Sequence, residues 1–331
     1  MIRDPFGRIL DYVRISVTDR CNYRCVYCMP REGIEWIPHE KILSYEDILF
    51  LCGVLVDLGV KRLRFTGGEP FVRKGFVPFL GEVRRVYPGL RVAVTTNGSF
   101  LDEFAGQIAL LGLDSLNVSL DTLDAVKFRR VSRTGCLEAV VRGIDAVVRH
   151  GSPFLKLNAV IMKGFNDGEI PGLMRFAEDS NSLLRLIEFM PLDGQVWSRA
   201  GFVSAEEMLD MLPDRDLWQA VPGEAKTSCG PSRYYENKRT GQKIGIISAV
   251  SDHFCGSCNR LRISSVGEVL PCLFSSSGVF AGDAVRKRDG ALARALILKA
   301  AASKPSGGET GLPAAEKDPA GEERHMSRIG G

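Results

Sequence analysis

Residues 61–70 read Lys61-Arg62-Leu63-Arg64-Phe65-Thr66-Gly67-Gly68-Glu69-Pro70, a short strand-like run that ends in glycines and a carboxylate. Three later strand-like runs also end in polar or small residues, namely Thr95-Thr96-Asn97-Gly98, Ser119 with Asp121, and Glu188 with Met190. In (β/α) barrels the active site is built at the carboxyl ends of the strands. The segment therefore predicts one unit of a repeated βα architecture with a site at the strand ends.

Six strand candidates alternate with five helix candidates over the first 200 residues. The strands are expected at Leu10–Val17, Lys61–Thr66, Arg91–Thr96, Ser115–Leu120, Leu155–Met162 and Leu183–Phe189. The helices are expected from Ser44-Tyr45-Glu46-Asp47, which resembles a capping box, to Gly59, and near Lys74–Tyr87, Leu101–Leu111, Leu137–His150 and Asp167–Asp179. This alternation favours a parallel sheet.

The predicted fold class is α/β, with residues 1–200 as a partial (β/α)6 TIM-like barrel, because six strands are too few to close an eight-stranded barrel. Residues 201–331 are predicted to form a C-terminal α+β extension that covers the open side. It includes hairpin-like segments at Arg233–Ile247 and Asn259–Leu270 and a helix at Ala291–Ala302. The composition of Lys304–Glu323, rich in Gly, Pro, Lys and Glu, predicts a mobile tail.

The bulk composition narrows the function classes. The chain has 331 residues, 45% hydrophobic and 25% charged, and its formal net charge of +3 is no nucleic-acid footprint. No apolar run reaches the length of about 18 residues that a membrane span needs. Met1–Phe6 carries charges and no apolar signal core. A cytoplasmic protein that binds neither nucleic acid nor membrane is expected.

Nine cysteines are an unusual number, and the odd count argues against a closed disulfide set. One group is Cys21-Asn22-Tyr23-Arg24-Cys25-Val26-Tyr27-Cys28, and a second combines Cys255, Cys258 and Cys272. Cys52 and Cys136 stand alone in apolar surroundings and are expected to be buried core thiols. Cys229 has no assigned role.

Each cysteine group offers three close thiolates, whereas structural zinc normally takes four ligands. A cubane cluster held by three cysteines leaves one iron open for a substrate, so two [4Fe–4S] clusters are the better chemical interpretation. The alternative for the second group is a zinc ribbon completed by His253.

The spacing Cys21-x3-Cys25-x2-Cys28, with Tyr27 before the last cysteine, resembles the signature of the radical S-adenosylmethionine superfamily. Gly67-Gly68-Glu69-Pro70 resembles its second motif, in which glycine backbone groups accept the methionine amino group of the cofactor. The resemblance narrows to the GTP 3′,8-cyclases of molybdenum cofactor biosynthesis and covers almost the entire chain. It rests on Arg64–Pro70, Thr95–Gly98, Ser119–Asp121, Glu188-Phe189-Met190-Pro191, Cys255-x2-Cys258-Asn259-Arg260-Leu261-Arg262 and Gly330-Gly331.

The resemblance implies a lyase that cleaves S-adenosylmethionine at the first cluster. The resulting radical removes hydrogen from C3′ of GTP, and the sugar radical attacks C8 to give (8S)-3′,8-cyclo-7,8-dihydroguanosine 5′-triphosphate. It also implies a homodimer and an electron donor of unknown identity. The implied residues are Cys21, Cys25 and Cys28 for the first cluster; Cys255, Cys258 and Cys272 for the second; Tyr27, Gly68, Ser119 and Met190 for S-adenosylmethionine; and Arg14, Arg64, Thr95, Lys156, Arg260, Leu261 and Arg262 for GTP.

Several basic residues make sense without the resemblance. Arg14 and Lys156 each interrupt an otherwise apolar strand candidate. One such residue usually extends its charge to solvent, but several in one barrel indicate a pocket for an anion such as a triphosphate. Gly330 and Gly331 would ordinarily be a frayed end. In the family the tail enters the active site, so both are expected to assist catalysis.

Two other functions fit parts of the sequence. One is a radical enzyme that modifies a peptide and carries an auxiliary cluster, although such enzymes usually have more C-terminal cysteines. The other is a zinc-binding adaptor without enzymatic activity, for which glycine-rich strand ends would have no purpose.

Overall fold

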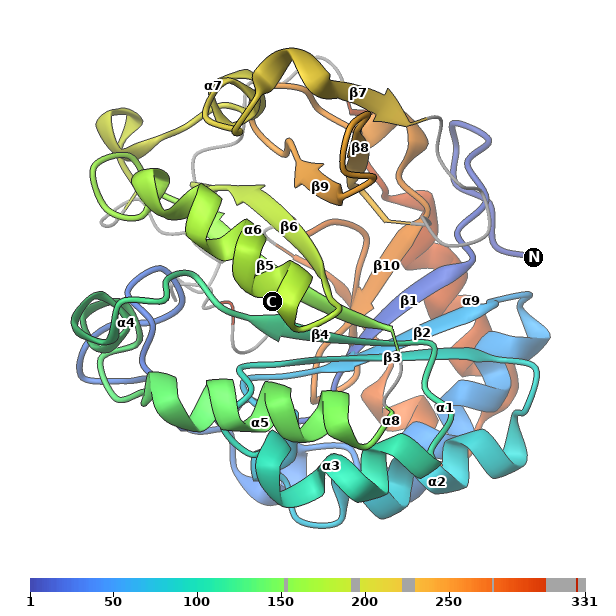
Figure 1. Ribbon diagram of the computed structural model, residues 1–331. Helices are drawn as coiled ribbons and strands as arrows, with labels where there is room; N and C mark the ends of the chain where they lie inside the picture. Colours follow the sequence, from blue (N-terminus) through green and yellow to red (C-terminus); the bar gives the residue numbers. More distant parts are fainter. Residues whose placement is uncertain (152–153, 192–196, 222–229, 276, 308–325, 327–331) are drawn as a thin grey trace.

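The computed structural model describes residues 1–151, 154–191, 197–221, 230–275, 277–307 and 326. All six predicted strands are present and lie side by side in sequence order in one parallel sheet (Figure 1). They are β1 (Tyr12–Ser16), β2 (Arg62–Thr66), β3 (Arg91–Thr96), β4 (Ser115–Ser119), β5 (Leu155–Ile161) and β6 (Leu183–Glu188).

The five predicted helices are also confirmed, as α1 (Tyr45–Asp57), α2 (Phe76–Val86), α3 (Leu101–Leu110), α5 (Leu137–Arg149) and α6 (Ile170–Asp179). Ser44 begins α1 with a true capping box, because its hydroxyl accepts from Asp47 N at 3.1 Å and the Asp47 carboxylate accepts from Ser44 N at 3.0 Å. Short helices that the sequence did not predict are α4 (Ala125–Ser132), α7 (Ala205–Asp210) and α8 (Gly282–Arg286).

The C-terminal part of the chain extends the sheet at both edges. β10 (Arg260–Ile263) pairs parallel with β1, and β9 (Lys243–Ile247) pairs parallel with β6. The two predicted hairpins are confirmed: β8 (Arg233–Asn237) is antiparallel to β9, and β11 (Glu268–Leu270) is antiparallel to β10. β7 (Trp218–Val221) and β12 (Val279–Phe280) form the outer edges. The C-terminal strands thereby cover the edges of β1 and β6, which would otherwise expose unpaired backbone groups.

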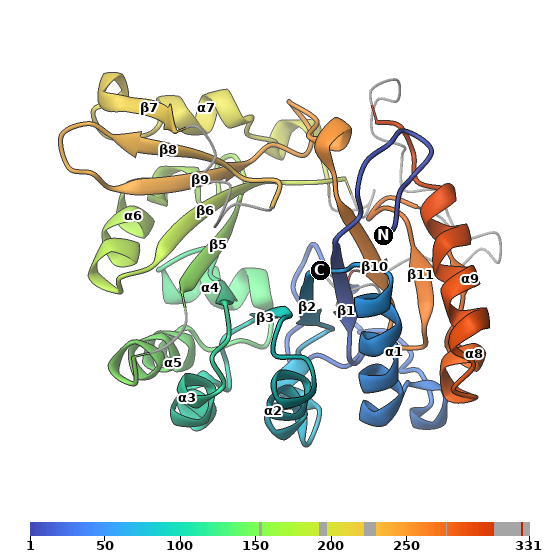
Figure 2. The ribbon, with the colours of Figure 1, turned by 90° about the vertical axis from the view of Figure 1, so that its right-hand side faces the viewer.

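The sheet is strongly curved (Figure 2), and side chains along each strand alternate between its two faces. Val13 and Ile15 of β1 and Leu63 and Phe65 of β2 are fully buried in the core that packs against the surrounding helices. The residues between them, such as Arg14, point to the opposite face and line a cavity. The fold is thus the predicted partial barrel, with an apolar outer layer and a polar interior.

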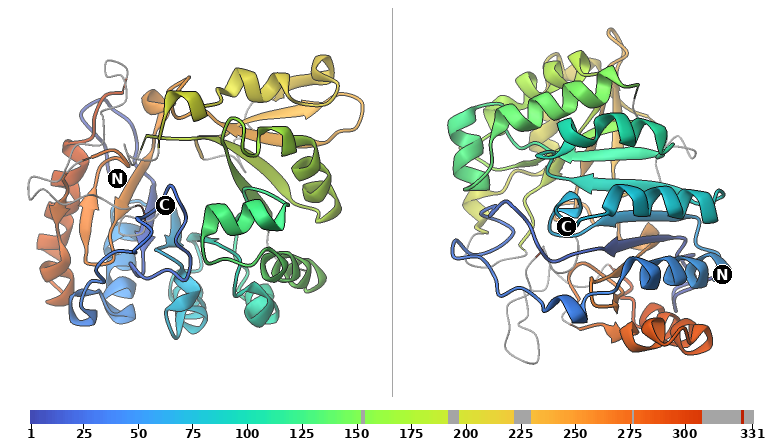
Figure 3. Two further views of the ribbon diagram at one scale, coloured as in Figure 1. Left: turned by 90° about the vertical axis from the view of Figure 1, so that its left-hand side faces the viewer. Right: turned by 90° about the horizontal axis from the view of Figure 1, so that it is seen from below.

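The N-terminal segment and the segment that follows the last long helix lie against each other. The N-terminal segment lies beside α9 (Gly290–Ala302), which matches the predicted C-terminal helix (Figure 3). The Arg8 guanidinium joins them by donating to Pro305 O at 2.5 Å and Ser306 O at 3.1 Å. No helix in the described part of the chain is both long and apolar enough to cross a bilayer.

Two local expectations are wrong. Cys52 is buried as predicted, but Cys136 is exposed and its thiol contacts Glu138 at 3.1 Å. Cys136 precedes α5 at the surface, and only its apolar neighbour Leu137 turns inward. The predicted tail begins too early, because Lys304 is only 4% exposed and packs against β10 and β11. Residues 308–325 lie outside the described residues.

Candidate active site

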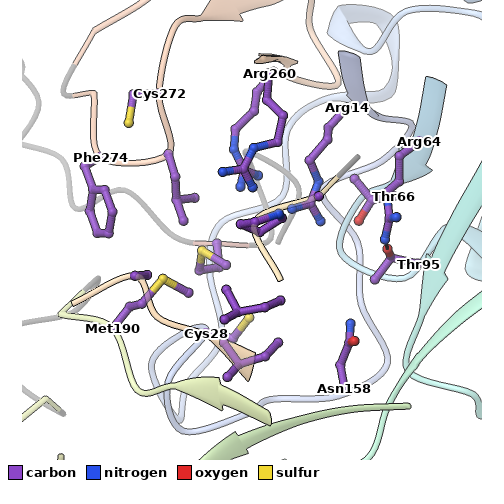
Figure 4. A pocket seen from close by; sticks show the side chains of 18 of the residues that line it. Arg14, Cys28, Arg64, Thr66, Thr95, Asn158, Met190, Arg260, Cys272 and Phe274 are labelled. Carbon is purple, nitrogen blue, oxygen red and sulfur yellow. Dashed lines mark hydrogen bonds between the residues drawn. The ribbon is translucent and has the colours of Figure 1, made fainter. Parts of the chain in front are cut away.

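One cavity of about 620 Å³ lies inside the curved sheet at the carboxyl ends of the strands. Side chains from β1 and β2, the loops after β2 to β4, and the C-terminal segments around Cys258 and Cys272 all contribute to its wall (Figure 4). Both cysteine groups line it, with Cys21, Cys25 and Cys28 from one segment and Cys255, Cys258 and Cys272 from another. The two groups, more than 200 residues apart in sequence, therefore share a single cavity.

The glycine motif after β2 supports the segment that leads into Cys21. Gly68 N donates to Thr18 O at 2.8 Å, and Glu69 N donates to Arg20 O at 2.8 Å. A Cβ atom on Gly68 would lie 2.3 Å from Arg20 O, which is far inside any allowed contact. Gly68 is therefore required first of all for the close approach of two backbone segments beside the first cysteine group.

The segment after β3 orients the same loop from another side. The Asn97 side-chain amide donates to Asn22 Oδ1 at 2.9 Å and contacts Cys21 Sγ at 3.9 Å. Glu69 fixes Asn97 in turn, because its buried carboxylate accepts from Asn97 N at 2.6 Å and from the Thr96 hydroxyl at 2.8 Å. Burial raises the pKa of Glu69 to about 7 although these hydrogen bonds lower it.

Tyr27 ties the cysteine loop to β4 and β5. Its phenol donates to Asp121 Oδ2 at 2.6 Å, and Asp121 Oδ1 accepts from Val160 N at 2.9 Å. Burial raises the pKa of Asp121 to about 6, while these two hydrogen bonds lower it. The aromatic residue before the last cysteine is thus anchored by the acid of the segment Ser119–Asp121.

The unpredicted helix α4 completes the support of the first cysteine group. Arg24 N donates to Ser132 O at 3.0 Å, and Val26 N donates to Val131 O at 2.9 Å. Because the backbone between Cys21 and Cys28 is held at these points, the three sulfur atoms face the cavity from a fixed loop.

The first cysteine group fits an iron–sulfur cluster. Burial, followed by the charge of Glu69, raises the pKa of Cys21 to about 11, and burial with Cys21 and Asp121 raises that of Cys28 to about 12. Three half-buried thiols this close together ionise readily only beside a cation, and the irons of a cluster would supply one. Within the described residues no three His, Cys, Asp or Glu side chains are arranged to hold a single metal ion. A cubane, whose thiolates bind separate irons, does not require that arrangement.

The second cysteine group lies in a more positive environment. Cys255 begins a short 3-10 turn (Cys255–Ser257), and Cys272 follows β11. Burial alone would raise the pKa of Cys258, but the charges of Arg260 and Lys304 outweigh it and bring the pKa to about 7. A thiol that ionises so readily is suited to bind metal.

Strand register gathers arginines on the wall of the cavity that the two cysteine groups share. Arg14 is paired with Arg262 on one side and with Arg64 on the other, so the three side chains project from neighbouring strands to the same face. Figure 4 shows Arg14, Arg64 and Arg260 directed into the cavity. The Arg64 guanidinium donates to the Thr95 hydroxyl at 3.2 Å, and its Nε donates to the Tyr12 hydroxyl. This arginine layer is suited to an anionic ligand with several charges.

The sequence analysis did not identify Arg185, Asn117 and Asn158 as site residues, although all three lie in predicted strands. Arg185 Nε donates to Asn158 Oδ1 at 2.9 Å, and Arg185 Nη2 donates to Asn117 Oδ1. Burial, then repulsion by Arg64, lowers the pKa of Arg185 to about 10, and burial with Arg260 lowers that of Arg262 to about 10. The available signal was the period-two alternation of polar residues in β4 and β5, which places Asn117 and Asn158 on the polar face.

The structure brings most of the predicted site residues together in this cavity. Tyr27, Gly68, Ser119 and Met190 line it, as do Arg14, Arg64, Thr95, Arg260 and Arg262. Lys156 is buried on β5, where its ammonium lies 5.0 Å from the Phe154 ring, and it is not part of the cavity wall. The Leu261 side chain packs in the core on the opposite face, so its backbone alone could reach a ligand. Cys229, Gly330 and Gly331 lie outside the described residues.

Comparison with known proteins agrees with this geometry. Residues 15–177 match the radical SAM superfamily, and residues 182–310 match the family Molybdenum Cofactor Synthesis C. A GTP 3′,8-cyclase of Geobacter sulfurreducens is 42% identical over 275 residues, which cover 83% of this chain and 84% of the relative. The Agrobacterium fabrum relative of the same name is 40% identical over 99% of this chain and 94% of its own length.

Among solved structures, Streptococcus suis SuiB aligns over 81% of this chain and 61% of its own, with a TM-score of 0.60. At 15% identity this likeness concerns the fold alone. One assignment follows from the two family matches, from the sequence identity along nearly the whole chain and from the two cysteine groups. The chain belongs to the GTP 3′,8-cyclase family of the radical S-adenosylmethionine superfamily.

Proposed function

We propose that this enzyme converts GTP into (8S)-3′,8-cyclo-7,8-dihydroguanosine 5′-triphosphate, an early step of molybdenum cofactor biosynthesis. One observation carries the proposal: a layer of arginines on adjacent strands lines the same cavity as two three-cysteine groups. A substrate that carries a triphosphate and a base with metal-binding atoms matches both parts of that cavity. The name of the similar proteins, GTP 3′,8-cyclase, supports the same substrate.

Each part of the cavity has a defined task in this proposal. Cys21, Cys25 and Cys28 would hold the first [4Fe–4S] cluster, which with S-adenosylmethionine supplies the radical chemistry of the reaction. Tyr27, Gly68, Ser119 and Met190 would line the S-adenosylmethionine site. Cys255, Cys258 and Cys272 would hold a second cluster whose open iron binds the guanine.

The arginine layer would orient GTP between the two groups. Arg14, Arg64 and Arg262 are brought side by side by strand register, so they can contact several phosphate oxygens at once. The triphosphate would also relieve the repulsion between cations that, after burial, lowers the pKa of Arg262 and Arg185. Val160 and Ile187, which line the same cavity, keep the reacting atoms away from water.

The reaction is tested with anaerobically reconstituted protein, S-adenosylmethionine, a chemical reductant and GTP that carries deuterium at C3′. The expected result is a cyclised nucleoside triphosphate together with deuterium in the 5′-deoxyadenosine, and about eight irons per chain. Unlabelled GTP gives the control for mass. Deuterium-free 5′-deoxyadenosine with modification of a peptide would favour the peptide-modifying alternative. Colourless protein that holds zinc would favour the adaptor.

We further propose that Gly330 and Gly331 assist catalysis from the end of the chain. Met326, close to them in sequence, lines the cavity, and two residues without bulky side chains could enter it. Deleting Gly330 and Gly331 is expected to abolish GTP turnover while the iron content is unchanged. Replacing Ser327 with alanine is the matched control. Unchanged turnover in the deletion variant would refute this role.

Oxygen-sensitive clusters and six reduced thiols suit a reducing compartment, so we also propose that the enzyme works in the cytoplasm. The homodimeric state and the need for an electron donor stay predictions of the family resemblance.

A further inference from the structure

Lys304 carries a buried charge that the proposed function does not use. It follows the end of α9, and its side chain reaches back under β10 and β11. Only 4% of the residue is exposed. Its Nζ donates to Arg260 O at 2.8 Å and to Pro271 O at 2.7 Å.

These two acceptors belong to the two segments that carry the second cysteine group. Arg260 lies two residues after Cys258, and Pro271 directly precedes Cys272. One ammonium group therefore ties the start of β10 to the end of β11 at the point where each segment presents a cysteine. Loss of the ammonium would leave two buried carbonyl groups without this donor.

The charge of Lys304 is balanced by sulfur rather than by a carboxylate. The Lys304 ammonium contacts the Cys258 side chain and lies near that of Cys272. Within the described residues no Asp or Glu forms an ion pair with it. An ammonium group so deeply buried is unfavourable without an opposite charge, so the thiolates are its natural counter-charge.

The segment around Lys304 is itself held against the second cysteine group. We define residues 303–307 as the C-terminal strap. The Arg8 guanidinium donates both to Pro305 O in the strap and to Cys255 O, at 2.5 and 2.6 Å. A Cβ atom on Gly307 would lie 1.9 Å from the Cβ of Cys255. The strap therefore also contacts Cys255, the remaining member of the second cysteine group. Lys304 thus extends from a fixed backbone and not from a loose end.

We propose that Lys304 is a positioning residue for the second cluster. Its ammonium fixes the distance between the segments of Cys258 and Cys272 and places a positive charge beside the cluster that they hold. A cluster bound by three thiolates gains negative charge when it is reduced, so a nearby cation stabilises the reduced form and raises the reduction potential. This inference rests on the proposed second cluster.

The test uses the full chain with Cys21, Cys25 and Cys28 all replaced by alanine, so that only the second cysteine group can assemble a cluster. Lys304→Met removes the ammonium, and Lys304→Arg keeps a charge. Lys299→Met is the matched control because Lys299 is exposed on α9, the helix that Lys304 follows. The midpoint potential is measured by a redox titration followed by electron paramagnetic resonance. The rate of iron loss to a chelator is measured in parallel.

The expected result is a more negative midpoint potential and several-fold faster iron loss in Lys304→Met, a partial return of both in Lys304→Arg, and no change in Lys299→Met. If Lys304→Met does not hold a cluster, Lys304→Gln provides the comparison, since it keeps a donor without the charge. Parental potential and parental iron loss in the uncharged variants would overturn the inference. A background chain that binds zinc or no iron would instead overturn the second cluster, and the role of Lys304 with it.

Discussion

Replacing Cys25 with alanine is expected to abolish both S-adenosylmethionine cleavage and GTP turnover and to leave about half of the iron. Cys25 is one of three thiols on a loop that is fixed by Tyr27, Asn97 and α4, so no neighbouring side chain is placed to substitute for it. Its carbonyl still accepts from Cys28 N at 2.9 Å, and therefore the loop keeps its shape in the variant. Iron analysis and chromatography of 5′-deoxyadenosine measure the effect.

Cys258→Ala tests the second cysteine group in the same way. It also loses about half of the iron, but it keeps the first cysteine group, so slow cleavage of S-adenosylmethionine is expected without a cyclised product. Cys52→Ala controls for the loss of any thiol, because Cys52 is buried in the core of α1 far from the cavity wall. It should keep both activities at a stability cost of about 1 kcal/mol. S-adenosylmethionine cleavage by Cys25→Ala would contradict the assignment of the first cluster.

The barrel strands and most of the helices could be predicted because each is a run of apolar residues with clear ends. Helix α4 was missed for a physical reason: it is short and rich in basic residues, and it buries mainly Phe128 and Val131. A signal was present in Asp124, whose carboxylate caps the helix by accepting from Val126 N at 2.8 Å and Lys127 N at 2.9 Å. The placement of β9 and β10 beside β6 and β1 depends on long-range pairing, which local pattern does not encode.

The cysteine groups could be predicted because their spacing is local, whereas the cations of the cavity could be predicted only in part. Arg185 was missed because its neighbours on β6 are apolar, and its role depends on Asn117 and Asn158 from other strands. Lys304 lies in a segment whose composition is typical of a mobile tail. Its burial results from contacts with β10 and β11, and such tertiary contacts override local composition.

Gly68→Ala is expected to destabilise the protein and to weaken S-adenosylmethionine binding at least tenfold, since both effects follow from one clash. The added Cβ would lie 2.3 Å from Arg20 O and 2.5 Å from Arg20 C, and these are backbone atoms that cannot turn away. The segment of Arg20 would have to separate from the strand end, which would break the hydrogen bonds at Gly68 N and Glu69 N and displace Cys21. Overpacking of this kind costs about 1–3 kcal/mol.

Denaturant unfolding measures the stability of this variant, and equilibrium dialysis under anaerobic conditions measures the binding of S-adenosylmethionine. Gly172→Ala is the matched control, because Gly172 lies within α6 and no heavy atom stands within 4 Å of the position that an added methyl group would take. Alanine there should stabilise the helix by about 1 kcal/mol and leave binding unchanged. Parental affinity in Gly68→Ala would mean that the glycine motif and the first cysteine group are not coupled through the backbone of Asp19 and Arg20, the two residues with which the added Cβ clashes.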